Sequence, residues 1–308
     1  MKILGVGNSF TRNATKFLPQ MISSDPKINA EVGVAYIGGC DLEKHVTLAN
    51  AHEQDESKGN QYQYTLDGRT KMTGASLKAI LTAKNWDYIT IQQVSSKSYK
   101  PESFHPYADD LITYIKKYQP DAKIVIHETW AHSPASPRVK IWNLSPGDMY
   151  QKLHRNYTDL AQKYDSKIIP VGTAFHQAKT TPEWSFEATP VDVRELNARL
   201  SWPEDKDNLP VNRKTLHNDV YWKKKSDSEE RAVFADGYHA NYRGEYLGVL
   251  VWIESFFGTP ATGVTYRPES ISAAQAESLK KVAREAIEIY RSKSRKHKAE
   301  PAVAAPSE

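Results

Sequence analysis

Short apolar segments alternate with amphipathic segments along the first half of the chain. The short segments are rich in β-branched residues and end at polar or glycine residues, which is typical of buried strands. They lie at Ile3–Val6, Ala30–Ile37, Tyr88–Ile91, Lys123–Ile126 and Lys167–Val171. The segments between them have apolar residues three and four positions apart, which predicts helices. These lie at Ala14–Ile22, Gly74–Ala83, Pro106–Tyr118 and Pro146–Tyr164.

This alternation of strands and helices predicts an α/β fold. A strand followed by a helix usually returns to the same sheet as a parallel strand, and helices then cover both faces. We therefore expect a three-layer α/β/α sandwich around a central, mostly parallel five-stranded sheet. In such sheets the working site lies at the carboxyl ends of the strands. Side chains at those ends are the first candidates for chemistry.

The second half of the chain departs from this rhythm. Residues 174–235 are rich in Pro, Asn, Asp, Lys and Trp and lack a long apolar stretch, which indicates an insertion with some helix near Val191–Leu200. Tyr242–Phe257 is strongly apolar and is followed by Gly258, and Ser272–Ser292 predicts one more amphipathic helix. We expect one domain over residues 1–292 and a basic, disordered tail over 293–308.

Composition narrows the class of protein and of partner. Of the 308 residues, 39% are hydrophobic and 25% are charged, which suits a globular protein. The formal charge of +4 is concentrated in Lys223–Lys225 and Arg291–Lys298, so no basic face indicates binding to nucleic acid. No apolar run reaches the length of about 18 residues that a membrane span needs. Cys40 is the only cysteine, which excludes an internal disulfide and a cysteine-based zinc site.

The sequence is compatible with more than one cellular location. Met1 leads directly into the first predicted strand, so the chain as written suggests a cytoplasmic protein. A mature domain would look the same after removal of a leader. A periplasmic or secreted location is therefore the alternative.

The first predicted strand runs into the sequence GVGNSFT at Gly5–Thr11, and a helix follows. Ser9 is therefore expected on a tight turn beside the unpaired backbone N–H groups of a helix N-terminus. Such groups can stabilise an oxyanion, which a serine nucleophile requires. Two alternatives compete with this interpretation. Ser9 could be a helix cap, or the turn could bind a dinucleotide, which Phe10 opposes because that pattern needs glycine there.

A second constellation lies just before the late apolar helix, in the sequence ADGYH at Ala235–His239. A histidine can act as a base for a serine only if another group holds its ring, normally a carboxylate at the other nitrogen. Asp236 lies three residues before His239 and could supply that carboxylate. The Asp-x-x-His spacing is common by itself, and a capping or core histidine is the alternative. Its combination with Ser9 predicts a Ser-His-Asp triad.

At these residues the sequence resembles the SGNH/GDSL hydrolase superfamily, in a branch with G-N-S-F-T at the nucleophile, here Gly7–Thr11. The resemblance extends over Lys2–Phe257 and implies a flavodoxin-like fold and a serine esterase that needs no cofactor. It also implies an oxyanion hole whose first donor is the Ser9 N–H. The second donor would be a glycine at the end of the second strand, Gly39 or, less favoured, Gly38.

The third block departs from the superfamily pattern, which usually has Gly-x-Asn-Asp. Here the third strand ends in IQQVS at Ile91–Ser95. Glutamine has the same amide donor as asparagine on a longer side chain, so Gln92 or Gln93 could complete the oxyanion hole. Neighbouring side chains point to opposite faces of a strand. We therefore expect only one of them at the site and favour Gln92.

The fourth strand ends in HETWAH at His127–His132. Its two histidines are not spaced as in the H-E-x-x-H motif, and the segment indicates strand and loop, not helix. We therefore predict no metal site. Glu128 and Trp130 are expected instead at the rim of the pocket, in contact with substrate.

The expected substrate is a small-molecule or glycan ester. Several tryptophans fall in loops on the expected active face or in the insertion, where flat rings could stack on sugars or simply pack the loops. These are Trp130, Trp142, Trp184, Trp202 and Trp222. We favour removal of O-acyl, in particular O-acetyl, groups from a carbohydrate. An acyltransferase with the same nucleophile and a non-catalytic glycan-binding module on a hydrolase-like fold are the alternatives.

Overall fold

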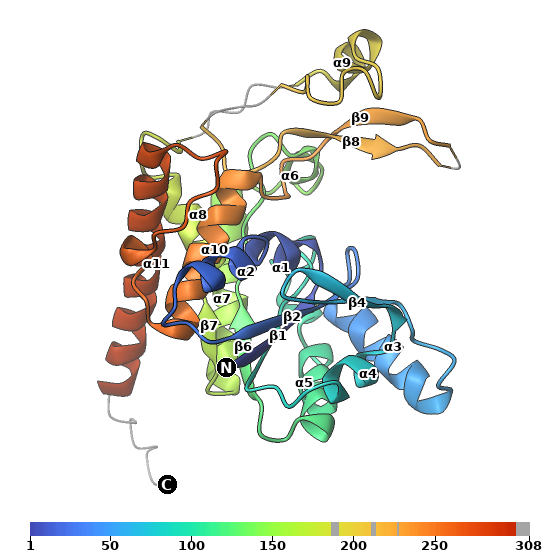
Figure 1. The fold of residues 1–308 in the computed structure, drawn as a ribbon, viewed down its shortest axis with the longest axis vertical. Helices are drawn as coiled ribbons and strands as arrows, with labels where there is room; N and C mark the ends of the chain where they lie inside the picture. The colour runs from blue at the N-terminus through green and yellow to red at the C-terminus, as the bar shows by residue number, and fades with distance from the viewer. Residues whose placement is uncertain (186–190, 211–213, 227, 300–308) are drawn as a thin grey trace, which may run out of the picture.

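A seven-stranded sheet lies at the centre of the protein (Figure 1). The structure is a computed structural model that describes residues 1–185, 191–210, 214–226 and 228–299. The strands follow the order β4-β3-β2-β1-β5-β6-β7 across the sheet. Their bounds are β1 Lys2–Gly7, β2 Glu31–Tyr36, β3 Tyr62–Leu66, β4 Arg69–Ala75, β5 Tyr88–Ile91, β6 Lys123–His127 and β7 Lys167–Ile169.

Five of these strands pair in parallel, and they are the five that the hydrophobic pattern predicts. β1 lies between β2 and β5, and the row continues through β6 to β7. The carboxyl ends of β1, β2 and β5 therefore lie at one edge of the sheet, followed by Ser9, Gly39 and Gln92 respectively. The predicted α/β/α class with a mostly parallel sheet is confirmed.

The predicted number of five strands is wrong, because β3 and β4 add an antiparallel hairpin to the β2 edge. The hairpin turns at Asp67 and Gly68, which both have positive φ angles of 49° and 75°. Six of the seven residues of β4 are exposed, so this strand has no apolar pattern to reveal it. The Asp-Gly pair was the available signal, since this dipeptide favours the tight turns of hairpins.

Helices cover both faces of the sheet. α3, α4, α5 and α7 enclose one apolar core, whereas α1, α2, α8, α10 and α11 enclose the other. Along β1, Leu4 and Val6 face the first core and Ile3 faces the second. The bounds are α1 Ser9–Ala14, α2 Leu18–Ser24, α3 Leu42–Gln54, α4 Leu77–Thr82, α5 Tyr107–Tyr118, α6 Pro137–Ile141, α7 Pro146–Lys163, α8 Val171–Ala178, α9 Val193–Arg199, α10 Tyr242–Phe257 and α11 Ala273–Ala299, with 3-10 turns at Pro101–Ser103 and Ala261–Gly263.

Two helices differ in extent from the sequence prediction. The helix predicted at Ala14–Ile22 is two helices, and the first of them begins at Ser9 itself. α11 continues past Ser292 to Ala299, so the helix takes up the first part of the predicted tail. Residues 300–308 of that tail lie outside the described residues. No helix in the described part of the chain is long and apolar enough to span a membrane.

The predicted insertion contains a small unit built from α9 and an antiparallel hairpin, β8 (Val220–Lys224) and β9 (Arg231–Ala235). Leu196 of α9 packs with Val220 and Val233 of the hairpin in an apolar cluster of its own. Figure 1 shows the hairpin extending beyond the main body. The chain returns from this hairpin directly into Asp236 and α10, so the insertion ends at the predicted triad.

Candidate active site

The turn after β1 places Ser9 as the first residue of α1. Asn8 caps this helix, because its side-chain Oδ1 accepts a hydrogen bond from the Phe10 N–H at 3.0 Å. A Cβ at Gly7 would lie 2.3 Å from the Thr11 hydroxyl oxygen, so only glycine allows the turn to pack this closely. The cap is therefore Asn8, and the Ser9 side chain is left partly exposed at the sheet edge.

Three side chains from the two ends of the chain meet at this turn. The Ser9 Oγ and His239 Nε2 atoms are 3.0 Å apart. On the other side of the ring, His239 Nδ1 lies 3.1 Å from Asp236 Oδ2. Asp236 is buried, with 1% of its surface exposed, whereas the His239 side chain is partly open to solvent. The geometry is that of a nucleophile, a base and a carboxylate that orients the base.

The turn that carries Asp236 and His239 is tightly held. Asp236 Oδ1 accepts hydrogen bonds from the backbone N–H groups of Tyr238, at 3.1 Å, and His239, at 3.0 Å. Gly237 has a φ angle of 78°, and a Cβ there would lie 2.6 Å from the Ser136 backbone. Glycine is therefore the residue that fits, both for the left-handed backbone and for the close approach.

Both strand-end glutamines are buried, but they serve different neighbours. Gln92 Nε2 donates to Asn8 Oδ1 at 2.7 Å, and Gln92 Oε1 accepts from the Thr11 hydroxyl at 2.8 Å. Gln93 Nε2 donates to the Ser103 carbonyl at 2.8 Å. Only Gln92 therefore lies against the Ser9 turn, and one of its two amide hydrogens is bound to Asn8.

Gly39 lies in the exposed loop after β2, with a φ angle of 62°. A Cβ built on Gly39 would have no atom within 4 Å, so the space beside it is open. The loop is tied to the nucleophile turn, because Asn8 Nδ2 donates to the Cys40 carbonyl at 2.8 Å. Asn8 thus connects the turn at Ser9 with both other strand ends, through Cys40 and Gln92.

The prediction that Glu128 and Trp130 line the pocket rim is wrong, since both are 0% exposed. Glu128 is an internal anchor: its Oε2 accepts from the Thr173 N–H at 2.7 Å, and its Oε1 lies 2.8 Å from His154 Nδ1. Strand alternation cannot distinguish a rim residue from one covered by later helices. α7, which carries His154, and α8, which carries Thr173, cover this position.

Trp130 supports the site from behind. Its ring is stacked between Phe10, at 4.2 Å between centroids, and Phe175, at 4.6 Å. Its Nε1 donates to the Tyr238 carbonyl at 2.9 Å. Trp130 therefore contacts the residues next to both Ser9 and His239 without reaching solvent.

The two histidines of the HETWAH segment are also internal. His127 packs edge-on against Trp252, and burial lowers its pKa to about 3. His132 Nε2 lies 2.9 Å from the Ser95 hydroxyl, and burial lowers its pKa as well. Among the described residues no group of three or more His, Cys, Asp and Glu side chains could hold a metal ion.

The residues that do flank His239 were not singled out from the sequence. The Tyr238 ring is 4.3 Å from the His239 ring, and the Tyr221 ring from β8 is 6.4 Å from it. Of the tryptophans proposed as sugar platforms, Trp184 is 2% exposed, Trp202 and Trp222 pack against each other at 5.8 Å, and the partly exposed Trp142 lies 5.2 Å from the His132 ring. No sequence pattern indicated that β8 brings Tyr221 to His239, so only the fold reveals this contact.

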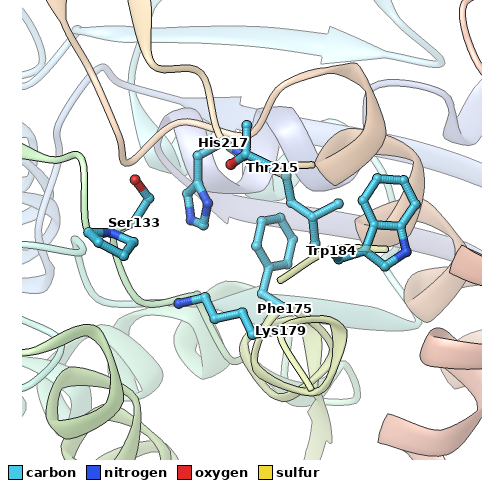
Figure 2. Close-up of a pocket in the computed structure, with 8 residues that line it drawn as sticks. Ser133, Phe175, Lys179, Trp184, Thr215 and His217 are labelled. Atoms are coloured by element: carbon cyan, nitrogen blue, oxygen red, sulfur yellow. The ribbon is translucent and has the colours of Figure 1, made fainter. Parts of the chain in front are cut away.

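A separate small cavity contains none of the three predicted triad residues. It is lined by Phe175, Lys179, Trp184, His217 and neighbouring residues and has a volume of about 10 Å³, enough for about one water molecule. Figure 2 shows the Lys179 side chain extending toward Ser133 and His217. In the described part of the chain Lys179 has no ion pair, and burial lowers its pKa to about 8.

This buried ammonium should reduce the stability of the fold. The pKa of Lys179 is lower in the folded protein than the value of about 10.4 expected in the unfolded chain. The cost is therefore fully present below pH 8 and is relieved as the pH rises toward 10.4. We expect Lys179→Met to raise the free energy of unfolding at pH 7 by about 1–3 kcal/mol. Urea unfolding at pH 7, 8, 9 and 10 should show this gap shrinking.

Lys152→Met, at an exposed position of α7, is the matched control for loss of a charge. It should leave the free energy of unfolding nearly unchanged across the same pH range. A Lys179→Met protein that is no more stable than the parent at pH 7 would contradict the conclusion that the Lys179 ammonium destabilises the fold.

The family described as "Domain of unknown function (DUF4886)" matches residues 2–189, more than half of the chain. The match includes Ser9, Gly39 and Gln92 and ends before Asp236 and His239. No curated protein matches the chain.

Solved structures similar to this one include a DUF4886 family protein from Bacteroides uniformis ATCC 8492. It is 23% identical, with 94% of this chain and 95% of that one covered and a TM-score of 0.70. A candidate SGNH hydrolase from Slackia heliotrinireducens is 19% identical, covering 83% of this chain and 98% of that one, with a TM-score of 0.49. Phospholipase A1 from Streptomyces albidoflavus NA297 is 9% identical, covering 82% and 98%, with a TM-score of 0.42. The first likeness shows a shared fold.

Proposed function

The chain belongs to the DUF4886 family, and we propose that it is a serine esterase of the SGNH type. The observation that carries this proposal is the unbroken path from the Ser9 hydroxyl through the two ring nitrogens of His239 to the buried Asp236 carboxylate, with contacts of 3.0 and 3.1 Å. If Ser9 were only a helix cap, a contact between its hydroxyl and a histidine ring would not be expected. If His239 were only a core histidine, its Nε2 atom would not be expected to face the hydroxyl of a partly exposed serine.

In the proposed reaction His239 Nε2 accepts the Ser9 proton as Ser9 Oγ attacks the ester carbonyl. Asp236 holds the proton on His239 Nδ1 and stabilises the imidazolium that forms. His239 then protonates the leaving alcohol, and the acyl group stays on Ser9. A water molecule, activated by His239 in the same way, releases the acid. These steps use only the chain's own side chains and water.

The proposed oxyanion hole consists of the backbone N–H groups of Ser9 and Gly39 and the Gln92 amide. The open space beside Gly39 leaves room for a substrate oxygen to approach. Gln92 would use the amide hydrogen that is not bound to Asn8. Its hydrogen bonds to Asn8 and Thr11 would also keep the nucleophile turn in place, a contribution that a shorter asparagine could not make from the same backbone position.

We further propose that the substrate is an O-acyl, in particular O-acetyl, ester of a carbohydrate. The partial exposure of Ser9 and His239 supports a carbohydrate substrate, because a bulky ester can reach both side chains at the edge of the sheet.

The proposal is tested by incubating the protein with acetylated mono- and oligosaccharides and measuring acetate release, and by labelling it with a fluorophosphonate. We expect acetate release and one label per chain, on Ser9. A non-catalytic binding module would give neither. An acyltransferase would take up the label but transfer acetyl to an added sugar alcohol faster than to water. Either of these outcomes would show that the protein is not an esterase.

A further inference from the structure

The two faces of the β8–β9 hairpin have different chemistry. One face packs with α9 through Val220 and Val233. The other face carries Tyr221, Lys223 and Phe234. Tyr221 and Phe234 are cross-strand partners, with ring centroids 6.3 Å apart. Phe234 is 41% exposed, so the hairpin holds an aromatic ring out of its own small core.

This aromatic face begins at the proposed active site. The Tyr221 ring meets the His239 ring edge-on, at 6.4 Å and 82°, and also contacts the Phe234 ring. The backbone hydrogen bonds between β8 and β9 continue into the turn that carries Asp236 and His239, because the Asp236 N–H donates to the Asp219 carbonyl at 2.8 Å. The position of the face relative to His239 is therefore fixed by backbone hydrogen bonds.

The outer end of the face carries an exposed cation, the Lys223 ammonium. Lys223 Nζ lies 5.1 Å from the centroid of the Phe234 ring. The two lysines that follow are neutralised, Lys224 by Glu229 at 2.5 Å and Lys225 by Glu230 at 2.9 Å. In the described part of the chain Lys223 has no carboxylate partner. An exposed ammonium beside an exposed ring favours a ligand that has both a flat apolar surface and a negative charge.

We propose that Tyr221, Phe234 and Lys223 form a subsite for an acidic oligosaccharide whose ester group is attacked by Ser9. The C–H faces of sugar rings would stack on the two aromatic rings, and a uronate-type carboxylate would bind the Lys223 ammonium. This inference rests on the proposed esterase function and names its substrate class. A hydrocarbon chain suits this face less well, because an open face cannot enclose it and remove it from water.

Phe234→Ala tests the stacking. Met72→Ala is the matched control, since Met72 is a similarly exposed apolar residue, at 37%, on β4 at the edge of the main sheet. The readout is the ratio of kcat/KM for an acetylated uronic-acid oligosaccharide to kcat/KM for p-nitrophenyl acetate, which has neither a sugar ring nor a carboxylate. We expect Phe234→Ala to lower this ratio about five- to tenfold, mainly through KM. Met72→Ala should leave it unchanged.

Lys223→Gln tests the charge, with Lys224→Gln on the opposite face of the same strand as its control. We expect Lys223→Gln to raise KM for the acidic oligosaccharide severalfold and to leave KM for a neutral acetylated oligosaccharide nearly unaltered. Lys224→Gln should alter neither. Equal ratios in the Phe234→Ala and Met72→Ala proteins, or equal effects of Lys223→Gln on acidic and neutral substrates, would overturn the subsite.

A binding measurement separates this proposal from the esterase proposal. Calorimetric titration of the parent protein with the deacetylated acidic oligosaccharide requires no catalysis. If no ester is hydrolysed but the oligosaccharide binds more weakly to Phe234→Ala than to Met72→Ala, the esterase function fails and the sugar-binding face stands. If esters are hydrolysed and the two variants bind alike, the subsite fails alone.

Discussion

Replacing Ser9 with alanine should lower kcat for ester hydrolysis by about 10⁵- to 10⁶-fold. The Ser9 hydroxyl oxygen lies 3.0 Å from His239 Nε2, and its loss removes the acyl acceptor altogether. The fold should survive, because the helix is capped by Asn8 and not by Ser9. The measurement is initial rates on p-nitrophenyl acetate, with circular dichroism and thermal unfolding to compare the folds.

Ser23→Ala is the matched control for this variant. Ser23 is an exposed serine near the end of α2. Its replacement should leave both the rate and the fluorophosphonate label unchanged, whereas Ser9→Ala should take up no label. Hydrolysis by Ser9→Ala at more than about one hundredth of the parental rate would exclude Ser9 as the nucleophile.

The meeting of Ser9 with His239 could be expected from the sequence because element boundaries fix both residues. Ser9 follows a buried parallel strand, and His239 precedes the cap of α10, Asn241. In a parallel sheet the end of a strand and the start of a covering helix lie at the same edge. The nearness of two residues separated by most of the chain thus follows from two local patterns and one topological rule.

The surroundings of these residues could not be predicted in the same way. Glu128 and Trp130 follow a strand just as Gln92 does, yet α7 and α8 cover them, and no local pattern encodes that cover. The orientation of Gln92 depends on Asn8 and Thr11, which lie far from it in sequence. The aromatic face of the hairpin was hidden for another reason: its strands are short, basic and half exposed, so they resemble a polar loop.

Asp236→Asn should lower kcat by about 10³- to 10⁴-fold with little change in stability. Asp236 Oδ1 accepts two backbone hydrogen bonds, and the amide oxygen of asparagine can keep them. The amide nitrogen then faces His239 Nδ1 and can only donate to it. The ring is held with its proton on Nε2, the atom that must accept the proton of Ser9, so the base is present but in the wrong tautomer.

Asp236→Ala separates this effect from simple loss of structure. Alanine removes both the partner of His239 Nδ1 and the acceptor of the Tyr238 and His239 N–H groups. It should therefore lower kcat about as far as asparagine does and also reduce the free energy of unfolding by about 1–3 kcal/mol, since two partly buried donors lose their acceptor. Initial rates and urea unfolding of both variants test whether both lose activity while only Asp236→Ala loses stability. If Asp236→Asn kept more than a tenth of the parental kcat, His239 would not need this carboxylate, and the orienting role of Asp236 would have to be given up.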